Sequence, residues 1–321
     1  MNTLARTTRG AITVAPALAA AARGFVEAAT ADNTRLAYAY QWARFEGWCR
    51  DNGAASLPAL PGVVALYVTH MAEAGRAVAT IEQAVAAING AHRTAGQPLP
   101  KDDQGLRLVL RGIRRSKGIA QREAAPVLAA HLRRMVDALG ETLREQRDRA
   151  LLLVGFSGAF RRSELCALTF KDVAFTDSGL EITLRRGKTD QEGRGRLVAL
   201  PFTGHPSLCP VRNLKAWIEA SGLTEGPIFR QVTKHGLAGK GALTGRSVSR
   251  IIKAAAALAG LDSALYSGHS LRAGFVTQAK LKNKDEASIM RQTGHRSAAM
   301  VRKYDRRADL WRDNAAAGLL D

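Results

Sequence analysis

The chain has 321 residues, 46% of them hydrophobic, which is more than one average domain needs and enough for a substantial core. Its 47 lysines and arginines against 28 acidic residues give a formal net charge of +19. Such a charge attracts a polyanion, so a nucleic acid is the expected partner, although ribosomal and membrane-surface proteins can carry similar charge. No stretch is long and apolar enough to cross a bilayer. We therefore expect a cytoplasmic, nucleoid-associated protein that makes no membrane contact.

Residues 25–118 show helical periodicity without a strand signal, which predicts a helical DNA-binding domain. It follows an alanine-rich segment, residues 1–24, which faintly resembles a signal peptide but is more simply interpreted as a flexible tail. The first helix of the domain can be capped by Thr34. One face of that helix carries apolar side chains at a spacing of three or four, which indicates a core face rather than a surface for base stacking: Tyr38, Trp42, Phe45 and Cys49.

Two further helices are predicted over residues 63–74 and 78–95, and Gly96 ends the second. One face of the second helix, together with a position two residues before it, carries polar or basic side chains: Arg76, Thr80, Gln83, His92 and Arg93. This face is either solvated or in contact with DNA, and the spacing alone does not decide between the two.

A basic stretch leads into residues 119–126, which are interpreted as a linker because they end at a proline. Residues 127–321 then form the second predicted domain. Within it, residues 180–185 and 196–201 alternate apolar and polar side chains on either side of a glycine-containing loop. This pattern predicts a β-hairpin in an otherwise helical domain.

Four segments of the second domain carry side chains suited to chemistry at a phosphodiester. In chain order they supply Arg161 and Glu164, then Lys188, then His269 and Arg272, and finally His295 and Tyr304. Taken singly, each has an ordinary interpretation, such as a solvated loop lysine or a core tyrosine. His269 and Arg272 are three residues apart, so on a helix they share one face. Ser297 can cap a helix that leads to Tyr304.

Taken together, the order Arg, Lys, HxxR, GH and Tyr resembles the signature of the tyrosine recombinase (phage integrase) family. The segments 33–49, 77–96 and 267–272 are similar to the Cre-like branch of that family. The resemblance implies a mainly α-helical fold with a small β-hairpin or sheet. A helical, SAM-like core-binding domain would join a mixed α/β catalytic domain, and the two would form a C-shaped clamp on DNA.

The sequence departs from the family pattern at three positions near these residues. His295 stands where Cre has tryptophan, and Ala159 stands where many members have glycine. Arg162 stands where an apolar residue is usual, which raises the question of which arginine faces the phosphate. Arg161 is chosen because it lies three residues before Glu164, as the family pattern requires.

The resemblance assigns each residue a role that fits the chemistry of transesterification. Charge develops on the phosphate, and permanently charged guanidinium groups can hold its oxygens. A tyrosine nucleophile needs a proton acceptor, and the leaving 5′-oxygen needs a proton donor. The expected roles are Tyr304 as nucleophile, Arg161, Arg272 and His295 as phosphate ligands, His269 as base, Lys188 as general acid, and Glu164 as an orienting group. Neither a metal nor any other cofactor is required.

The same resemblance implies the partners. One partner is double-stranded DNA with inverted-repeat sites. The others are further copies of the chain, which form a homotetramer that exchanges strands through a Holliday junction. The tail 309–321 either packs on its own domain or is donated to a neighbouring subunit, which the resemblance favours. Residues 243–253 resemble a helix that enters the major groove, and Thr244 can cap it. Arg246 in this helix either reads a base or contacts a phosphate.

Two other functions remain open at this stage. A type IB topoisomerase shares the nucleophile, but it usually lacks the histidine that corresponds to His269 and needs no tetramer. A non-catalytic DNA-binding relative would not need the full set of catalytic residues. The target site and the biological task, whether integration, excision, inversion or dimer resolution, do not follow from the sequence.

Overall fold

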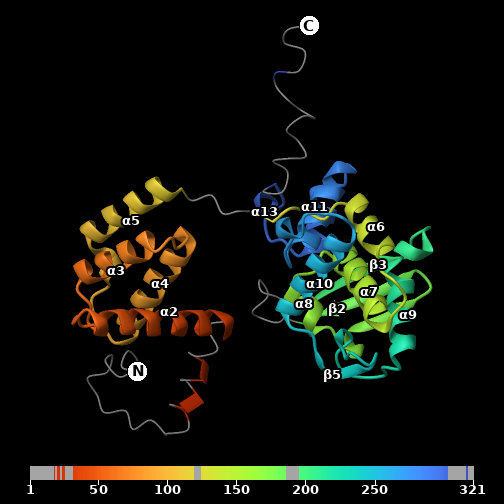
Figure 1. Ribbon diagram of the computed structural model, residues 1–321, viewed down its shortest axis with the longest axis horizontal. Helices are drawn as coiled ribbons and strands as arrows, with labels where there is room; N and C mark the ends of the chain where they lie inside the picture. Colours follow the sequence, from red (N-terminus) through yellow and green to blue (C-terminus); the bar gives the residue numbers. More distant parts are fainter. Residues whose placement is uncertain are drawn as a thin grey trace. The chain divides into compact units, whose positions relative to one another are not determined.

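The structure is a computed structural model that describes residues 32–118, 124–185 and 195–302, together with the single positions 18, 20, 21, 24, 25 and 316. The chain divides into two compact units, Met1–Arg122 and Glu123–Asp321 (Figure 1). Lys188, Tyr304 and all of the predicted tail helix except position 316 lie outside the described residues, as does most of the predicted N-terminal tail. No helix in the described part of the chain is long and apolar enough to span a membrane.

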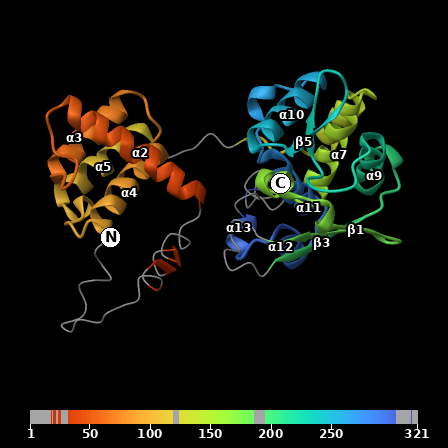
Figure 2. The same cartoon turned by 90° about the horizontal axis from the view of Figure 1, so that it is seen from below.

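The described residues of the first unit form helices joined by short loops, without a strand. Its helices are α2 (Asp32–Asp51), α3 (Pro61–Glu73), α4 (Val78–Thr94) and α5 (Gln104–Lys117), with the 3₁₀ turn η1 (Pro100–Asp102). Helix α2 packs mainly on α4, and α3 mainly on α5 (Figures 1 and 2). The helices predicted over 63–74 and 78–95, and the helix predicted from Thr34 onward, are confirmed to within a few residues. The assignment of Thr34 as a cap is wrong, because α2 begins at Asp32 and Thr34 lies within its first turn.

The apolar face predicted for the first helix lies in the core of this unit. Phe45 and Cys49 on α2 are almost completely buried, and Trp42 is half-buried. The Phe45 ring lies 5.1 Å from the Tyr67 ring of α3 and 5.7 Å from the Trp42 ring, measured between centroids. These aromatic side chains therefore stabilise the helix packing, as their spacing predicted.

The second unit combines helices with two small antiparallel sheets. Its helices are α6 (Ala129–Asp137), α7 (Leu143–Ser157), α8 (Arg162–Ala167), α9 (Pro210–Ser221), α10 (Gly245–Leu258), α11 (Ser270–Leu281), α12 (Glu286–Thr293) and α13 (Ala298–Arg302), with 3₁₀ turns η2 (Phe170–Asp172), η3 (Pro206–Leu208) and η4 (Ser263–Leu265). Its strands are β1 (Val173–Thr176), β2 (Gly179–Leu184), β3 (Arg196–Pro201), β4 (Arg230–Val232) and β5 (Ala238–Ala242).

The predicted β-hairpin is confirmed. Strands β2 and β3 pair antiparallel, with Leu180 opposite Leu200 and Ile182 opposite Val198, and these four side chains are buried on one face. Strand β1 adds a third, outer strand to this sheet, and β4 pairs with β5 in a separate sheet. These strands were not predicted, because β1 and β4 are very short and β5 consists of alanine, glycine and lysine, without alternating large apolar residues.

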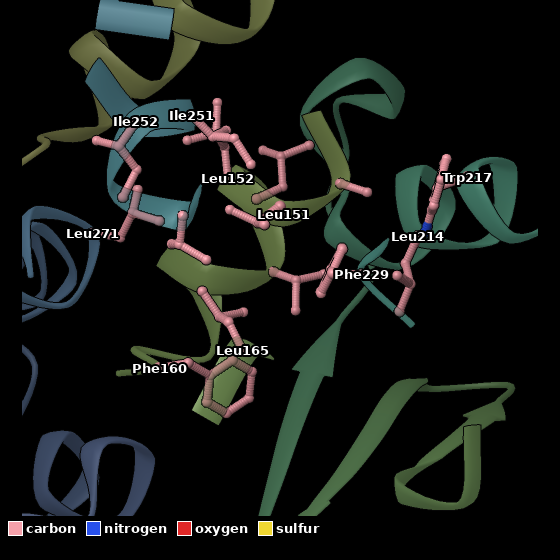
Figure 3. Packing of buried hydrophobic residues seen from close by; sticks show 14 of the residues in the cluster. Leu151, Leu152, Phe160, Leu165, Leu214, Trp217, Phe229, Ile251, Ile252 and Leu271 are labelled. Carbon is pink, nitrogen blue, oxygen red and sulfur yellow. The ribbon is translucent and has the colours of Figure 1, made fainter. Parts of the chain in front are cut away.

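Helix α7 forms the centre of the second core. Five successive residues, Ala150–Val154, are buried, so the helix is covered on all sides rather than on one face. Figure 3 shows Leu151 and Leu152 among side chains from α9, α10 and α11, with Phe160 and Leu165 below them. A capping box between Thr142 and Glu145 fixes the start of this helix. Its other end leads directly into the turn that carries Arg161.

Candidate active site

The site begins at the turn that follows α7. Ala159 has a φ of 50°, in the left-handed region that glycine adopts most easily, and the turn delivers Arg161 as the N-cap residue of α8. The Glu164 carboxylate accepts hydrogen bonds from the Arg161 backbone N–H at 2.8 Å and from its Nη1 at 2.7 Å. Because Glu164 is almost fully buried, it fixes both the backbone and the side chain of Arg161.

The neighbouring arginine is placed differently. Arg162 is exposed, and its side chain runs over Gly245 and Gly268, where an added Cβ would come within 3.3 Å and 2.9 Å of its Cδ. Only Arg161 of the pair is held by Glu164 among the described contacts. This geometry agrees with the choice of Arg161 from the sequence.

The second arginine of the predicted set lies on α11 and is bound to the same turn. Arg272 is 1% exposed, and its Nη1 donates a hydrogen bond to the carbonyl oxygen of Ala159 at 2.7 Å. His269 is the N-cap residue of α11 and is exposed, one turn before Arg272. The turn around Ala159 therefore brings together two arginines that are more than a hundred residues apart in sequence.

Hydrogen bonds join the start of α11 to Val127, near the beginning of the second unit. The Val127 backbone N–H donates to the carbonyl of Ser270 at 2.9 Å, and Ser270 Oγ accepts from the Ser267 N–H at 2.9 Å. A Cβ on Gly274 would lie 1.9 Å from the Val127 carbonyl oxygen, so only glycine allows this approach. Residue 127, the first residue of the predicted catalytic domain, thus helps to position His269 and Arg272.

His295 follows a tight turn at the end of α12, where Gly294 has a φ of 67°. The Thr293 hydroxyl donates to the carbonyl of Ile289 at 2.7 Å and lies 3.0 Å from His295 Nδ1. Since a hydroxyl has only one hydrogen, Nδ1 must be the donor to Thr293 Oγ1. The neutral ring therefore carries its proton on Nδ1.

Burial, followed by the positive charges of Arg272 and Arg161, lowers the pKa of His295 to about 4. The charges of His269 and Arg196 act in the same direction. The ring is therefore neutral near pH 7. The same electrostatic contributions place these residues around one strongly positive site, which suits a phosphate group.

Arg196, the first residue of β3, was not among the predicted site residues. Its Nη2 lies 3.6 Å from Glu164 Oε2, whereas the Arg161 side chain bonds to Oε1. No sequence signal distinguishes it from the other 46 lysines and arginines of the chain. Lys188 lies in the hairpin loop before Arg196, and Tyr304 follows α13 closely in sequence, but the described residues do not include either side chain.

The predicted DNA-facing residues of the first unit lie on its surface, with one exception. Arg76, Gln83 and Arg93 are exposed, and Thr80 is half-exposed. Gln83 Oε1 accepts a hydrogen bond from Gln41 Nε2 at 3.1 Å. The assignment of His92 to this face is wrong. His92 is completely buried, and its ring bonds to the Ala59 N–H and the Ile88 carbonyl at 2.8 Å each.

His92 was misplaced because helical spacing cannot distinguish a polar face from a buried polar side chain that finds backbone partners. Its ring accepts from the loop before α3 and donates within α4, so it fastens that loop to the helix. The two bonds satisfy both ring nitrogens and leave no role in DNA contact.

The predicted cap and start of the DNA-reading helix are confirmed. Thr244 Oγ1 accepts a hydrogen bond from the Ser247 N–H at 3.1 Å, and α10 begins at Gly245. Arg246 lies in the first turn and is exposed. A guanidinium at this position can reach a ligand in front of the helix.

We predict that Arg246→Ala relaxes the preference for one base pair in each half-site, because a bidentate arginine–guanine contact contributes about 1–3 kcal/mol of discrimination. The measurement is a selection of bound sequences from random DNA with both proteins. Recovery of the wild-type motif with merely weaker binding and a shallower salt dependence would instead assign Arg246 to a phosphate.

Comparison with known proteins places this geometry in a family. Residues 127–310 match the model of the phage integrase family. The chain is 39% identical over 294 residues to an integrase/recombinase XerD homologue of Selenomonas ruminantium, covering 90% of this chain and 86% of the relative. It is 30% identical over 295 residues to the recombinase Cre of Escherichia phage P1, covering 85% and 83%.

Solved structures share the fold at low sequence identity. The Tn1549 transposon integrase in complex with transposon right end DNA aligns with a TM-score of 0.59 at 18% identity, covering 86% of this chain and 89% of that chain. A lambda integrase dimer bound to a core site aligns with a TM-score of 0.56 at 17% identity, with the same coverage. The chain therefore belongs to the phage integrase family of tyrosine recombinases, enzymes that break and rejoin DNA.

Proposed function

We propose that this chain is a site-specific recombinase that cleaves one DNA strand with Tyr304 and rejoins it to a new partner strand. The observation that carries the proposal is the attachment of Arg161 and Arg272 to one turn, with His295 within electrostatic reach of both. Two guanidinium groups from distant parts of the chain then face one anion, as stabilisation of a phosphoryl transition state requires.

In the proposed reaction, Tyr304 Oη attacks the scissile phosphorus while its proton passes to His269. The bond from phosphorus to the 5′-oxygen breaks, and Lys188 protonates the leaving oxygen. The products are a 3′-phosphotyrosine and a free 5′-hydroxyl. A 5′-hydroxyl from the partner strand then attacks the phosphotyrosine, which reseals the strand and releases Tyr304. The bond energy is conserved, so ATP is not consumed.

We assign His295 to the phosphate as a hydrogen-bond donor. The Nδ1 tautomer leaves Nε2 of the neutral ring unprotonated, so donation requires a second proton. A bound phosphate favours this protonation, because an adjacent negative charge raises the pKa of an imidazole. His295 thus acquires its positive charge when DNA arrives.

DNA recognition and assembly are also proposed from the family. The two units would close on double-stranded DNA with inverted repeats, with Arg76, Thr80, Gln83 and Arg93 on one side and Arg246 on the other. Four copies would join two sites and pass through a Holliday junction in the nucleoid. Support comes from the exposure of these side chains and from fold relatives solved with DNA, such as the integrases described above.

The test uses two copies of a site obtained by selecting bound sequences from random DNA. A plasmid that carries both copies is incubated with the purified protein in EDTA and without ATP. We expect recombinant plasmids and trapped four-way junctions. Relaxation of a site-free supercoiled plasmid without recombinants would indicate the topoisomerase alternative. Binding with no strand joining would indicate a non-catalytic relative.

We predict that deletion of residues 308–321 leaves binding of a single subunit intact but weakens assembly on paired sites. The reason is that Leu310, Trp311, Leu319 and Leu320 would no longer cover an apolar surface on a neighbouring subunit. Light scattering of the protein–DNA complexes measures the assembly. An unchanged tetramer would place the tail on its own domain.

A further inference from the structure

Arg196 connects three parts of the second unit that also carry the site residues. It is the first residue of β3, its side chain is 18% exposed, and its Nη2 faces Glu164 Oε2 at 3.6 Å. Its Nη1 donates a hydrogen bond to the carbonyl of Gln292, in the last turn of α12. Figure 2 shows β3 and α12 side by side, in agreement with their contacts.

The Glu164 carboxylate is shared between two arginines. Oε1 accepts from Arg161 Nη1, and Oε2 accepts from the Arg161 backbone N–H and faces Arg196. Burial lowers the pKa of the Arg196 guanidinium, and the negative charge of Glu164 opposes that shift. Without Arg196, the buried Glu164 carboxylate would interact with Arg161 alone and could shift together with it. The positive charge of Arg196 beside Oε2 therefore helps to fix the position of the carboxylate.

The other end of the Arg196 guanidinium lies against the turn that precedes His295. A Cβ on Gly294 would come within 3.1 Å of three atoms of that group, Cζ, Nε and Nη1, so the absence of a side chain permits the contact. Gln292 strengthens the junction, since its Nε2 donates to the carbonyls of Ser157 at 2.8 Å and Ala199 at 3.3 Å. The end of α7 and strand β3 therefore meet at Gln292, whose carbonyl binds Arg196.

We propose that Arg196 is a positioning residue for DNA cleavage. It fixes the position of the Arg161 guanidinium through Glu164. It also fixes the turn at Gly294, which His295 and Tyr304 follow in sequence. The inference rests on the proposed cleavage reaction. Arginine suits the position because one planar group donates a hydrogen bond to the Gln292 carbonyl while its charge lies beside the Glu164 carboxylate.

The test is a double-mutant cycle of single-turnover cleavage on a nicked suicide substrate that carries the selected site. We expect Arg196→Gln to slow cleavage roughly 10- to 100-fold, since misplacement by about 1 Å has effects of this size, while the Kd for DNA is unchanged. In a Glu164→Gln background, Arg196→Gln should slow cleavage by less than about threefold further. Effects that multiply in the double variant would overturn the proposal, since Arg196 would then act independently of Glu164.

Arg149→Gln is the matched control. Arg149 is similarly buried and pairs with Glu141 at 3.1 Å and with backbone carbonyls, but it lies in the middle of α7 and its partners precede that helix, away from the turn that carries Arg161. Its loss should leave the cleavage rate unchanged. Thermal unfolding of each variant reports its stability, and Arg196→Lys takes the place of Arg196→Gln in the cycle if the latter does not fold.

The outcomes separate this inference from the proposed function. If the wild-type protein forms no covalent product, the proposed function fails. If it forms the product and the cycle is multiplicative, only the role of Arg196 fails. Arg196→Lys keeps a positive charge beside Glu164 but cannot reach both partners, so it should cleave at a rate between those of wild type and Arg196→Gln. Equal cleavage by wild type and Arg196→Lys would also contradict the proposal, because the double contact would then be unnecessary.

Discussion

Tyr304→Phe is expected to bind DNA as tightly as the wild-type protein and to form no covalent adduct. The substitution removes one oxygen atom, the proposed nucleophile, and keeps the aromatic ring. Packing and DNA contacts should therefore persist. The measurement compares an SDS-resistant protein–DNA band on nicked suicide substrates with the Kd for the same DNA. Loss should be complete, because no other group in the proposed mechanism can replace the phenolic oxygen.

Tyr266→Phe is the matched control for this prediction. Tyr266 is the other tyrosine of the second unit, it is buried, and its hydroxyl contacts His131 at 3.3 Å. Removing that hydroxyl should leave the covalent band unchanged. A Tyr304→Phe protein that still forms the band would exclude Tyr304 as the nucleophile.

Lys188→Ala has the second-largest expected effect. Loss of a general acid slows a reaction about 100- to 10,000-fold, because the 5′-oxygen would leave as an unprotonated alkoxide. A substrate with sulfur at the bridging 5′ position should restore cleavage, since a thiolate is a good leaving group without a proton. The measurement is the single-turnover cleavage rate on both substrates.

The pattern across substrates distinguishes the acid from a residue that only binds DNA. Lys215→Ala serves as the control, because Lys215 is an exposed lysine on α9 that pairs weakly with Glu219. It should cleave both substrates at the wild-type rate. A slow Lys188→Ala protein that sulfur does not rescue would reassign the acid, with His269 and His295 as the remaining candidates.

Much of the site could be predicted because its chemistry depends on residue types at characteristic spacings. The HxxR segment does lie at the start of a helix, with His269 as N-cap and Arg272 in the first turn. The choice of Arg161 over Arg162 also agrees with the structure, since Glu164 three residues later holds it. Thr244 could be assigned as a cap because capping depends on local sequence alone.

The rest depends on tertiary contacts that leave no local pattern. The burial of His92 is set by the backbone of a loop more than thirty residues away, so helical spacing placed it on the wrong face. Arg196 looks like an ordinary strand residue until folding brings it to Glu164 and to the end of α12. Strand β5 likewise pairs with β4 although its alanine, glycine and lysine residues have little intrinsic strand preference.

The most direct test of the central claim is identification of the amino acid that becomes linked to DNA. The wild-type adduct, trapped on a nicked substrate, is digested with nuclease and trypsin and analysed by mass spectrometry. Trypsin cleaves after Lys303 and Arg306, so we predict a peptide of residues 304–306 that carries a nucleotide through its 3′-phosphate on Tyr304. A nucleotide on another residue, or one attached through its 5′-phosphate, would contradict the account.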